Sequence, residues 1–114
     1  MIKMEAKSII HVVGTKCPPE TEAKFNTWYN ETHVPHLLKF KKLKRVTRYK
    51  NLHPAGEYPE FLTIYEFDNR QGFEEYHDSP ERTGSRESWL KIQEETGASL
   101  KWEVQFEVIK TWQR

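Results

Sequence analysis

The chain has 114 residues, which is the usual size of one domain. Its 18 basic and 17 acidic residues leave a net charge of +1, so it lacks the field that steers proteins to nucleic acid. The one cysteine, Cys17, excludes an internal disulfide, and no run approaches the roughly 18 apolar residues of a membrane span or resembles a signal peptide. We therefore expect a cytoplasmic protein with a single domain over residues 1–114, binding neither nucleic acid nor membrane.

The apolar fraction is low at 36%, whereas aromatic residues make up 13% of the chain. A large aromatic ring buries about 150–250 Å². The composition therefore predicts a small core that is rich in aromatic side chains. One protomer with so few aliphatic residues is marginal in stability, which favours burial of a further apolar face against a second copy.

The first predicted strand covers residues 7–15, a β-branched run that ends before a Pro-Pro pair. A helix over about residues 20–32 follows, with Pro19 suited to its first turn. Residues spaced by three and four form one stripe of this helix, which we expect to face the sheet: Phe25, Trp28, Tyr29 and Thr32. Because Pro35 disfavours helical geometry at Val34, the helix is predicted to end or kink beside His33.

Two further strands, over residues 43–52 and 60–67, are predicted to form a hairpin, because turn-forming residues separate them. Asp68-Asn69 is suited to cap a second helix that stops near Asp78-Ser79-Pro80, and another helix is predicted around residues 87–95. Apolar and polar side chains alternate most regularly over residues 100–112, and this pattern predicts a long strand with one buried face.

This order of elements predicts an α+β protein with the ferredoxin-like βαββαβ arrangement. Its four-stranded antiparallel sheet carries the helical segments on one face. Since nothing in the chain covers the other face, we expect a homodimer through the open sheet face.

The residues around the predicted helix end combine an aromatic pair, a histidine and a proline, in the pattern Phe25-x-x-Trp28-Tyr29-Asn30-x-x-His33-x-Pro35. With Leu37-Leu38 and Arg48-Tyr49 after it, this pattern resembles the EthD-like branch of the dimeric α+β barrel superfamily over about residues 7–67. The turn after the helix reads Phe40-Lys41-Lys42, where such families commonly have Pro-Gly, which indicates a divergent subgroup. The resemblance implies a dimeric α+β barrel, but this fold hosts monooxygenases, isomerases, dehydratase-like and haem-handling proteins.

His33 is the candidate catalytic residue. It lies one helical turn beyond Tyr29, so both side chains share a face, and an imidazole exchanges protons near neutral pH. This placement favours a general acid or base that acts on a bound organic molecule. The alternative is structural: His33 caps the helix end or packs on Trp28.

The other candidate residues are expected to bind substrate: Trp28, Tyr29, His11, Tyr49, Tyr65 and His36. His11 lies in the middle of a strand and can meet Glu66 or Gln105, either in a pocket or as a satisfied core histidine. Tyr49 and Tyr65 lie on adjacent strands and can point their phenols into one cavity, or simply belong to the core. No metal site is predicted, because a proline separates His33 from His36.

Two hypotheses of function stay open, and whether the protein is an enzyme is part of the choice. The first is a cofactor-independent enzyme acting on a small aromatic or polyketide-like molecule, with His33 as its proton carrier. The second is a non-catalytic dimer that binds a small ligand or serves as an accessory subunit. A weaker alternative is a haem-handling protein that uses His77, although the first strand lacks the asparagine that its haem-degrading relatives share. We predict no cofactor.

Overall fold

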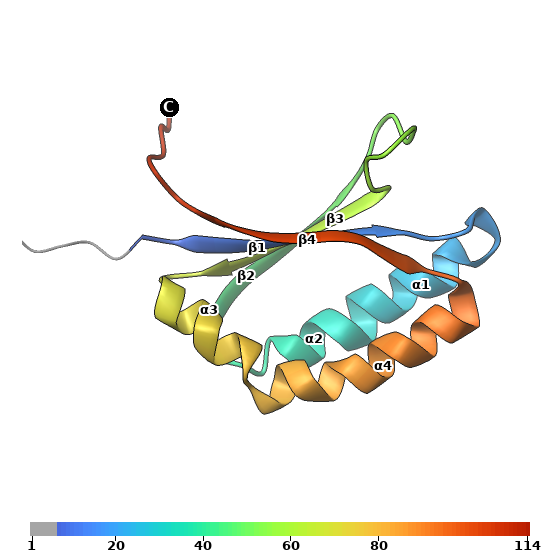
Figure 1. The fold of residues 1–114 in the computed structure, drawn as a ribbon, viewed down its shortest axis with the longest axis horizontal. Helices are drawn as coiled ribbons and strands as arrows, with labels where there is room; N and C mark the ends of the chain where they lie inside the picture. The colour runs from blue at the N-terminus through green and yellow to red at the C-terminus, as the bar shows by residue number, and fades with distance from the viewer. Residues whose placement is uncertain (1–6) are drawn as a thin grey trace, which may run out of the picture.

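The computed structural model describes residues 7–114. One sheet lies above a layer of helices, all on the same side of it (Figure 1). The strands are β1 (Ile9–Lys16), β2 (Leu43–Lys50), β3 (Phe61–Phe67) and β4 (Ser99–Glu107). The helices are α1 (Glu22–Trp28), α2 (Val34–Leu37), α3 (Arg70–His77) and α4 (Pro80–Thr96), with a 3₁₀ turn at Pro19–Thr21 and a π turn at Tyr29–His33.

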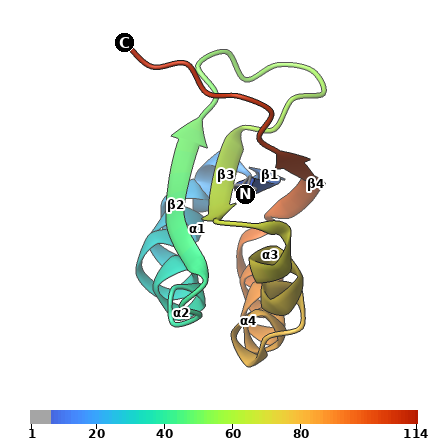
Figure 2. The same cartoon turned by 90° about the vertical axis from the view of Figure 1, so that its left-hand side faces the viewer.

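The sheet has the strand order β2-β3-β1-β4, and every pair of neighbours is antiparallel. Two helical columns cover one face, α1 with α2 and α3 with α4 (Figure 2). This topology is the predicted ferredoxin-like arrangement. The register places His11 of β1 between Tyr65 of β3 and Gln105 of β4.

The core between the sheet and the helices is small and aromatic, as the composition predicted. One cluster of buried residues consists of Ile9, Leu37, Leu43, Tyr65, Phe67 and Tyr76. A second cluster consists of Cys17, Phe25, Tyr29, Phe61, Ile92 and Ala98. Six of these twelve side chains are aromatic, so rings supply much of the buried apolar area.

The sequence predicted that the helix after β1 ends or kinks beside His33; the helix does not end there, but a π turn at Tyr29–His33 interrupts its regular geometry. Val34 keeps helical angles (φ −63°, ψ −47°) although it precedes Pro35. The helix widens instead, because the Val34 N–H donates its hydrogen bond to the carbonyl of Tyr29, five residues back. A π turn thus accommodates the proline and re-aims the side chains of residues 29–33.

Two other elements differ from their predicted bounds. Helix α4 begins at Pro80 rather than near residue 87, and Ser79 caps it by accepting a hydrogen bond from the Arg82 N–H. Strand β4 ends at Glu107, short of the predicted residue 112. Trp102, Val104 and Phe106 face away from the helices, so Phe106 is 54% exposed in the protomer and the predicted buried face of this strand is wrong for a single chain.

Candidate functional site

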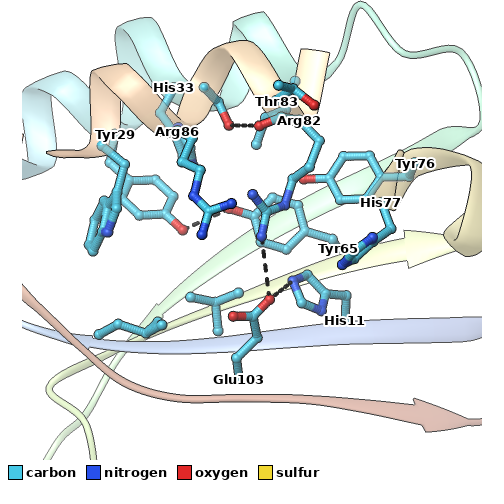
Figure 3. A pocket seen from close by; sticks show the side chains of 15 residues that line it. His11, Tyr29, His33, Tyr65, Tyr76, His77, Arg82, Thr83, Arg86 and Glu103 are labelled. Atoms are coloured by element: carbon cyan, nitrogen blue, oxygen red, sulfur yellow. Dashed lines mark hydrogen bonds and ion pairs between the residues drawn. The ribbon is translucent and has the colours of Figure 1, made fainter. Parts of the chain in front are cut away.

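A cavity of about 410 Å³ lies between the helix-covered face of the sheet and helix α4 (Figure 3). Ordinary ligand sites begin at roughly 300 Å³, so the space suffices for a small organic molecule. His11 and Glu103 form part of its floor on the sheet, while Arg82, Arg86 and Trp89 of α4 line the opposite side.

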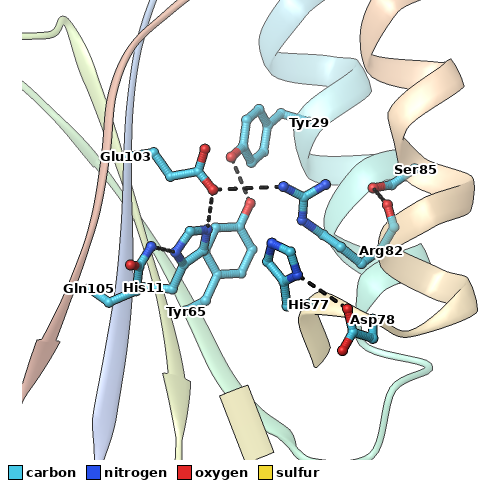
Figure 4. Close-up of polar contacts among 9 residues, drawn as sticks. All are labelled: His11, Tyr29, Tyr65, His77, Asp78, Arg82, Ser85, Glu103 and Gln105. Carbon is cyan, nitrogen blue, oxygen red and sulfur yellow. Dashed lines mark hydrogen bonds and ion pairs between the residues drawn. The ribbon is translucent and has the colours of Figure 1, made fainter. Parts of the chain in front are cut away.

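A chain of polar groups spans the cavity from the sheet to the helix (Figure 4). The Nε2 atom of His11 lies 3.2 Å from Oε1 of Glu103, and the same oxygen lies 3.7 Å from Nη2 of Arg82. On its other side, Nδ1 of His11 lies 2.9 Å from the side-chain amide nitrogen of Gln105. The amide donates to Nδ1, so the imidazole proton is on Nε2 and is donated to Glu103.

His11 is neutral at pH 7. Burial lowers its pKa to about 4, and Arg82 lowers it as well, while Glu103 opposes the shift. Its contact with Glu103 is therefore a hydrogen bond from a neutral imidazole to a carboxylate. This bond fixes the direction of the carboxylate, which is 34% exposed and faces the cavity.

Two phenols meet in the cavity wall next to this polar chain. The hydroxyl oxygens of Tyr29 and Tyr65 are 2.7 Å apart, and both side chains are buried. Burial raises the pKa of both phenols, so both stay protonated at neutral pH. One hydroxyl donates to the other, and the second keeps a proton for another acceptor. The Arg48 guanidinium lies over the Tyr29 ring at 4.1 Å from its centroid.

His33 lines the cavity and also packs on Trp28, so the structure combines the two roles considered for it. The two ring centroids are 4.6 Å apart and the rings are stacked. Nδ1 of His33 is buried and has no hydrogen-bond partner among residues 7–114. Burial lowers the pKa of His33 to about 4, with Arg82 and other basic groups adding to the shift, so this imidazole is neutral at pH 7.

The structure brings four of the seven candidate residues to the cavity: His11, Tyr29, His33 and Tyr65. Trp28 supports His33 from behind, and its indole N–H donates to the Ser88 hydroxyl at 2.9 Å. His36 does not line the cavity. Its Nε2 lies 3.1 Å from the Glu81 carbonyl, where it ties α2 to α4.

The structure contradicts the predicted place of Tyr49 in the cavity. It pairs with Leu62 rather than with a residue on the side of Tyr65, so its side chain lies on the open face and is 50% exposed. The two phenols therefore do not share a cavity. Of the two partners considered for His11, Gln105 is its neighbour, whereas Glu66 pairs with Ile10 and lies on the open face.

The sequence analysis missed Glu103, Arg82 and Arg86. The alternation of β4 contained a signal for Glu103, because it lies on the same side of that strand as Gln105. The two arginines are four residues apart, but the first turns of α4 have no apolar period, and the helix was not predicted there. Because no helix was predicted there, nothing in the sequence indicated that the two arginines share a face.

Residues 7–114 contain no group of three or more histidine, cysteine or acidic side chains placed to hold a metal ion, and no helix there is long and apolar enough to cross a membrane. His77, the histidine considered for haem, lies at the cavity rim with its side chain 67% exposed. Glu103, Arg82 and Arg86 line the cavity with charged groups, whereas the flat faces of a porphyrin need apolar contacts. These residues do not fit haem, and we expect a haemin titration to give no Soret shift.

The sequence matches a known protein family. Residues 8–96 match a family model described as "Domain of unknown function (DUF4286)". The chain belongs to this family. None of the curated proteins matches the DUF4286 protein in sequence.

Solved structures similar to the DUF4286 protein share its fold at low sequence identity. HapK from Hahella chejuensis is 13% identical with a TM-score of 0.64, over 95% of this chain and 97% of that one. A dimeric protein of unknown function and ferredoxin-like fold from Bacteroides fragilis is 21% identical with a TM-score of 0.64, over 89% and 96%. An EthD family protein from Bacillus halodurans is 16% identical with a TM-score of 0.61, over 92% and 99%. These likenesses show that the chain has the ferredoxin-like fold.

Proposed function

We propose that this DUF4286 protein is a cofactor-independent enzyme that moves a proton on a small aromatic or polyketide-like molecule bound in the cavity. One observation carries the proposal: the Glu103 carboxylate faces an aromatic cavity while a neutral His11 and Arg82 hold it in place. A general base must lie within reach of the proton that it removes, and a fixed carboxylate in a ligand cavity meets this need.

The first step removes a proton from the substrate. The proton passes to a carboxylate oxygen of Glu103, and the electron pair stays on the substrate as an enolate or phenolate. Arg82 and the phenol pair of Tyr29 and Tyr65 supply positive charge and a donor for the oxygen that becomes negative. Return of the proton to another atom completes an isomerisation or starts a cyclisation.

His33 is the second candidate for the proton carrier. Burial lowers the pKa of His33 to about 4, so this imidazole carries no proton at pH 7 and is a weak base. Position does favour Glu103, because Nδ1 of His33 is buried without a partner and His33 packs against Trp28. His33 then shapes the wall and orients the ligand.

The test begins with a thermal-shift screen of aromatic and polyketide-like compounds, together with mass identification of molecules that copurify. With a turned-over compound in hand, we expect Glu103→Gln to lower kcat about 10²–10⁴-fold with little change in binding, and His33→Gln to change kcat much less. Arg70→Gln, on α3 and paired with Glu107, is the matched control. Full activity of the Glu103 variant contradicts the proposal, and binding without turnover by the wild type favours the non-catalytic ligand-binding role.

We also propose a homodimer through the open sheet face. In the protomer this face exposes Tyr49, Trp102 and Phe106 by 50%, 37% and 54%. Large apolar side chains that stay exposed on one sheet face are typical of a surface that a second copy covers. The similar protein from Bacteroides fragilis is described as dimeric, which supports this assembly.

A further inference from the structure

Two arginines enter the cavity from the same side. Arg82 and Arg86 are four residues apart on α4 and therefore share one face of that helix. Figure 3 shows both guanidinium groups directed into the cavity. Arg82 is half-buried there, whereas Arg86 lines the cavity and stays exposed to solvent.

The carboxylates of the chain do not neutralise these two arginines. Arg82 has one acidic neighbour, Glu103, at 3.7 Å, which is too long for a hydrogen bond. Arg86 forms no ion pair with any carboxylate within residues 7–114. At least one guanidinium therefore keeps its donors for another partner.

The charges that line the cavity do not balance. Glu103 is the one acidic residue among the lining residues, against the two arginines, which leaves one positive charge. The phenols cannot supply the missing negative charge, because burial keeps Tyr29 and Tyr65 protonated. Charges interact more strongly in a cavity that is partly removed from water than on an open surface, so an anion gains from entering it.

We infer that the cavity takes an aromatic or conjugated organic acid, whose anionic group binds Arg86 and Arg82. This inference rests on the proposed function, because it names the chemical class of the molecule that the same cavity binds. A planar guanidinium matches a carboxylate with two parallel hydrogen bonds. The rings of Tyr29, Tyr65 and Trp89 provide apolar walls for the rest of the molecule. Arg82 then lies between the acidic group of the ligand and Glu103 and reduces the repulsion between the two.

The test compares two probes of equal shape and different charge, 2-naphthoate and 2-naphthamide, by isothermal titration calorimetry. We expect 2-naphthoate to bind at least about tenfold more tightly, as a charge-assisted hydrogen bond implies. Arg86→Gln is expected to weaken the carboxylate about tenfold and to leave the amide within about twofold. Arg86→Lys should recover part of the loss, since it keeps the charge but not the two-pronged geometry.

Arg70→Gln removes one positive charge from α3, where Arg70 pairs with Glu107, and serves as the control. It should leave both affinities unchanged. Equal affinity of the two probes, or an equal effect of Arg86→Gln on both, overturns the inference while the cavity remains a ligand site. Absence of binding by both probes at millimolar concentration contradicts the proposed function itself, and the inference with it.

Discussion

Strands β3 and β4 turn opposite kinds of side chain toward the helices, because β3 buries Phe61, Tyr65 and Phe67 there whereas β4 does not. Glu103 and Gln105 point toward the helices, where they form the polar chain with His11. Trp102 and Phe106 point the other way and stay exposed in the protomer. In most half-covered sheets the apolar side meets the chain's own helices. The contrast shows that alternation identifies two faces without saying which of them the same chain covers.

The largest expected effect comes from a charge on the open face. Phe106→Asp replaces a ring that we expect to be buried twice in a symmetric dimer, once by each copy. Burial of one such ring contributes about 1.5–3 kcal/mol, so the dissociation constant should rise roughly a thousandfold. Sedimentation at micromolar concentration should then find a monomer, with the circular dichroism spectrum of the folded chain retained.

Leu90→Asp is the matched control for this substitution. Leu90 lies on α4 and is 59% exposed, against 54% for Phe106, so the two substitutions introduce the same charge at similar exposure. The control should leave the dimer intact. Equal sedimentation of the wild type and both variants contradicts a dimer through the open face.

The next effect concerns the pH dependence of stability on the helix-covered face. The pKa of His33 is about 4 in the fold against an ordinary value of 6.5. Above pH 6.5 the imidazole is neutral in both states and has no effect. Between pH 6.5 and about 4 only the unfolded chain binds the proton, so stability falls as the pH falls, by up to about 3 kcal/mol for this group.

His33→Phe should flatten this fall, because it keeps a ring against Trp28 and removes the titrating nitrogen. At pH 7 the change is expected to be small or stabilising, since it also removes the buried Nδ1 that has no partner within residues 7–114. Urea unfolding at pH 7.5, 6.0 and 4.5 measures both effects. The control is His53→Asn, at an exposed position of the β2–β3 connection, which should keep the wild-type dependence of stability on pH. If His33→Phe also keeps the wild-type dependence, the prediction is contradicted.

Most of the fold was predictable because it depends on patterns of apolar residues and on turn chemistry. Asn69 caps α3 by accepting a hydrogen bond from the Gly72 N–H, and Gly97 ends α4 with φ 76°, as those residue types suggested. The π turn was not predictable in the same way. The rule that a residue before proline avoids helical angles gave a break at Val34, but the helix widened and kept its direction.

The site was predictable only in part, because it depends on register. Tyr49 and Tyr65 belong to paired strands, yet Tyr49 pairs with Leu62, three residues from Tyr65, and this odd offset sends one phenol to each face. The arginines of α4 could not be identified from the sequence for another reason. Where a helix lines a polar cavity, it loses the apolar period by which helices are recognised in a sequence. The charged residues that line the cavity were therefore the hardest to find.

A smaller effect tests the phenol pair on the helix-covered face. Tyr29→Phe or Tyr65→Phe leaves the other hydroxyl buried without its partner, which costs about 1–3 kcal/mol. The double variant should lose less than the sum of the two single variants, because it leaves no orphaned hydroxyl behind. Chemical unfolding of the four proteins gives the coupling energy, and strict additivity contradicts the bond.

The smallest effect concerns an ion pair on the open face, where Nε of Arg45 lies 2.9 Å from Oε2 of Glu66. In the monomeric Phe106→Asp background, Arg45→Gln should change stability by less than about 1 kcal/mol, because the pair is exposed. In the dimer a second copy removes water from this face, and loss of one partner leaves a buried charge, so the same substitution should cost more. The control is Lys24→Gln, which breaks an ion pair on the helical side, where Nζ of Lys24 lies 3.2 Å from Oε2 of Glu95. Its effect on stability should be the same in both backgrounds. An equal cost of Arg45→Gln in monomer and dimer places this pair outside the interface and confines the dimer contact to the part of the face nearer β4.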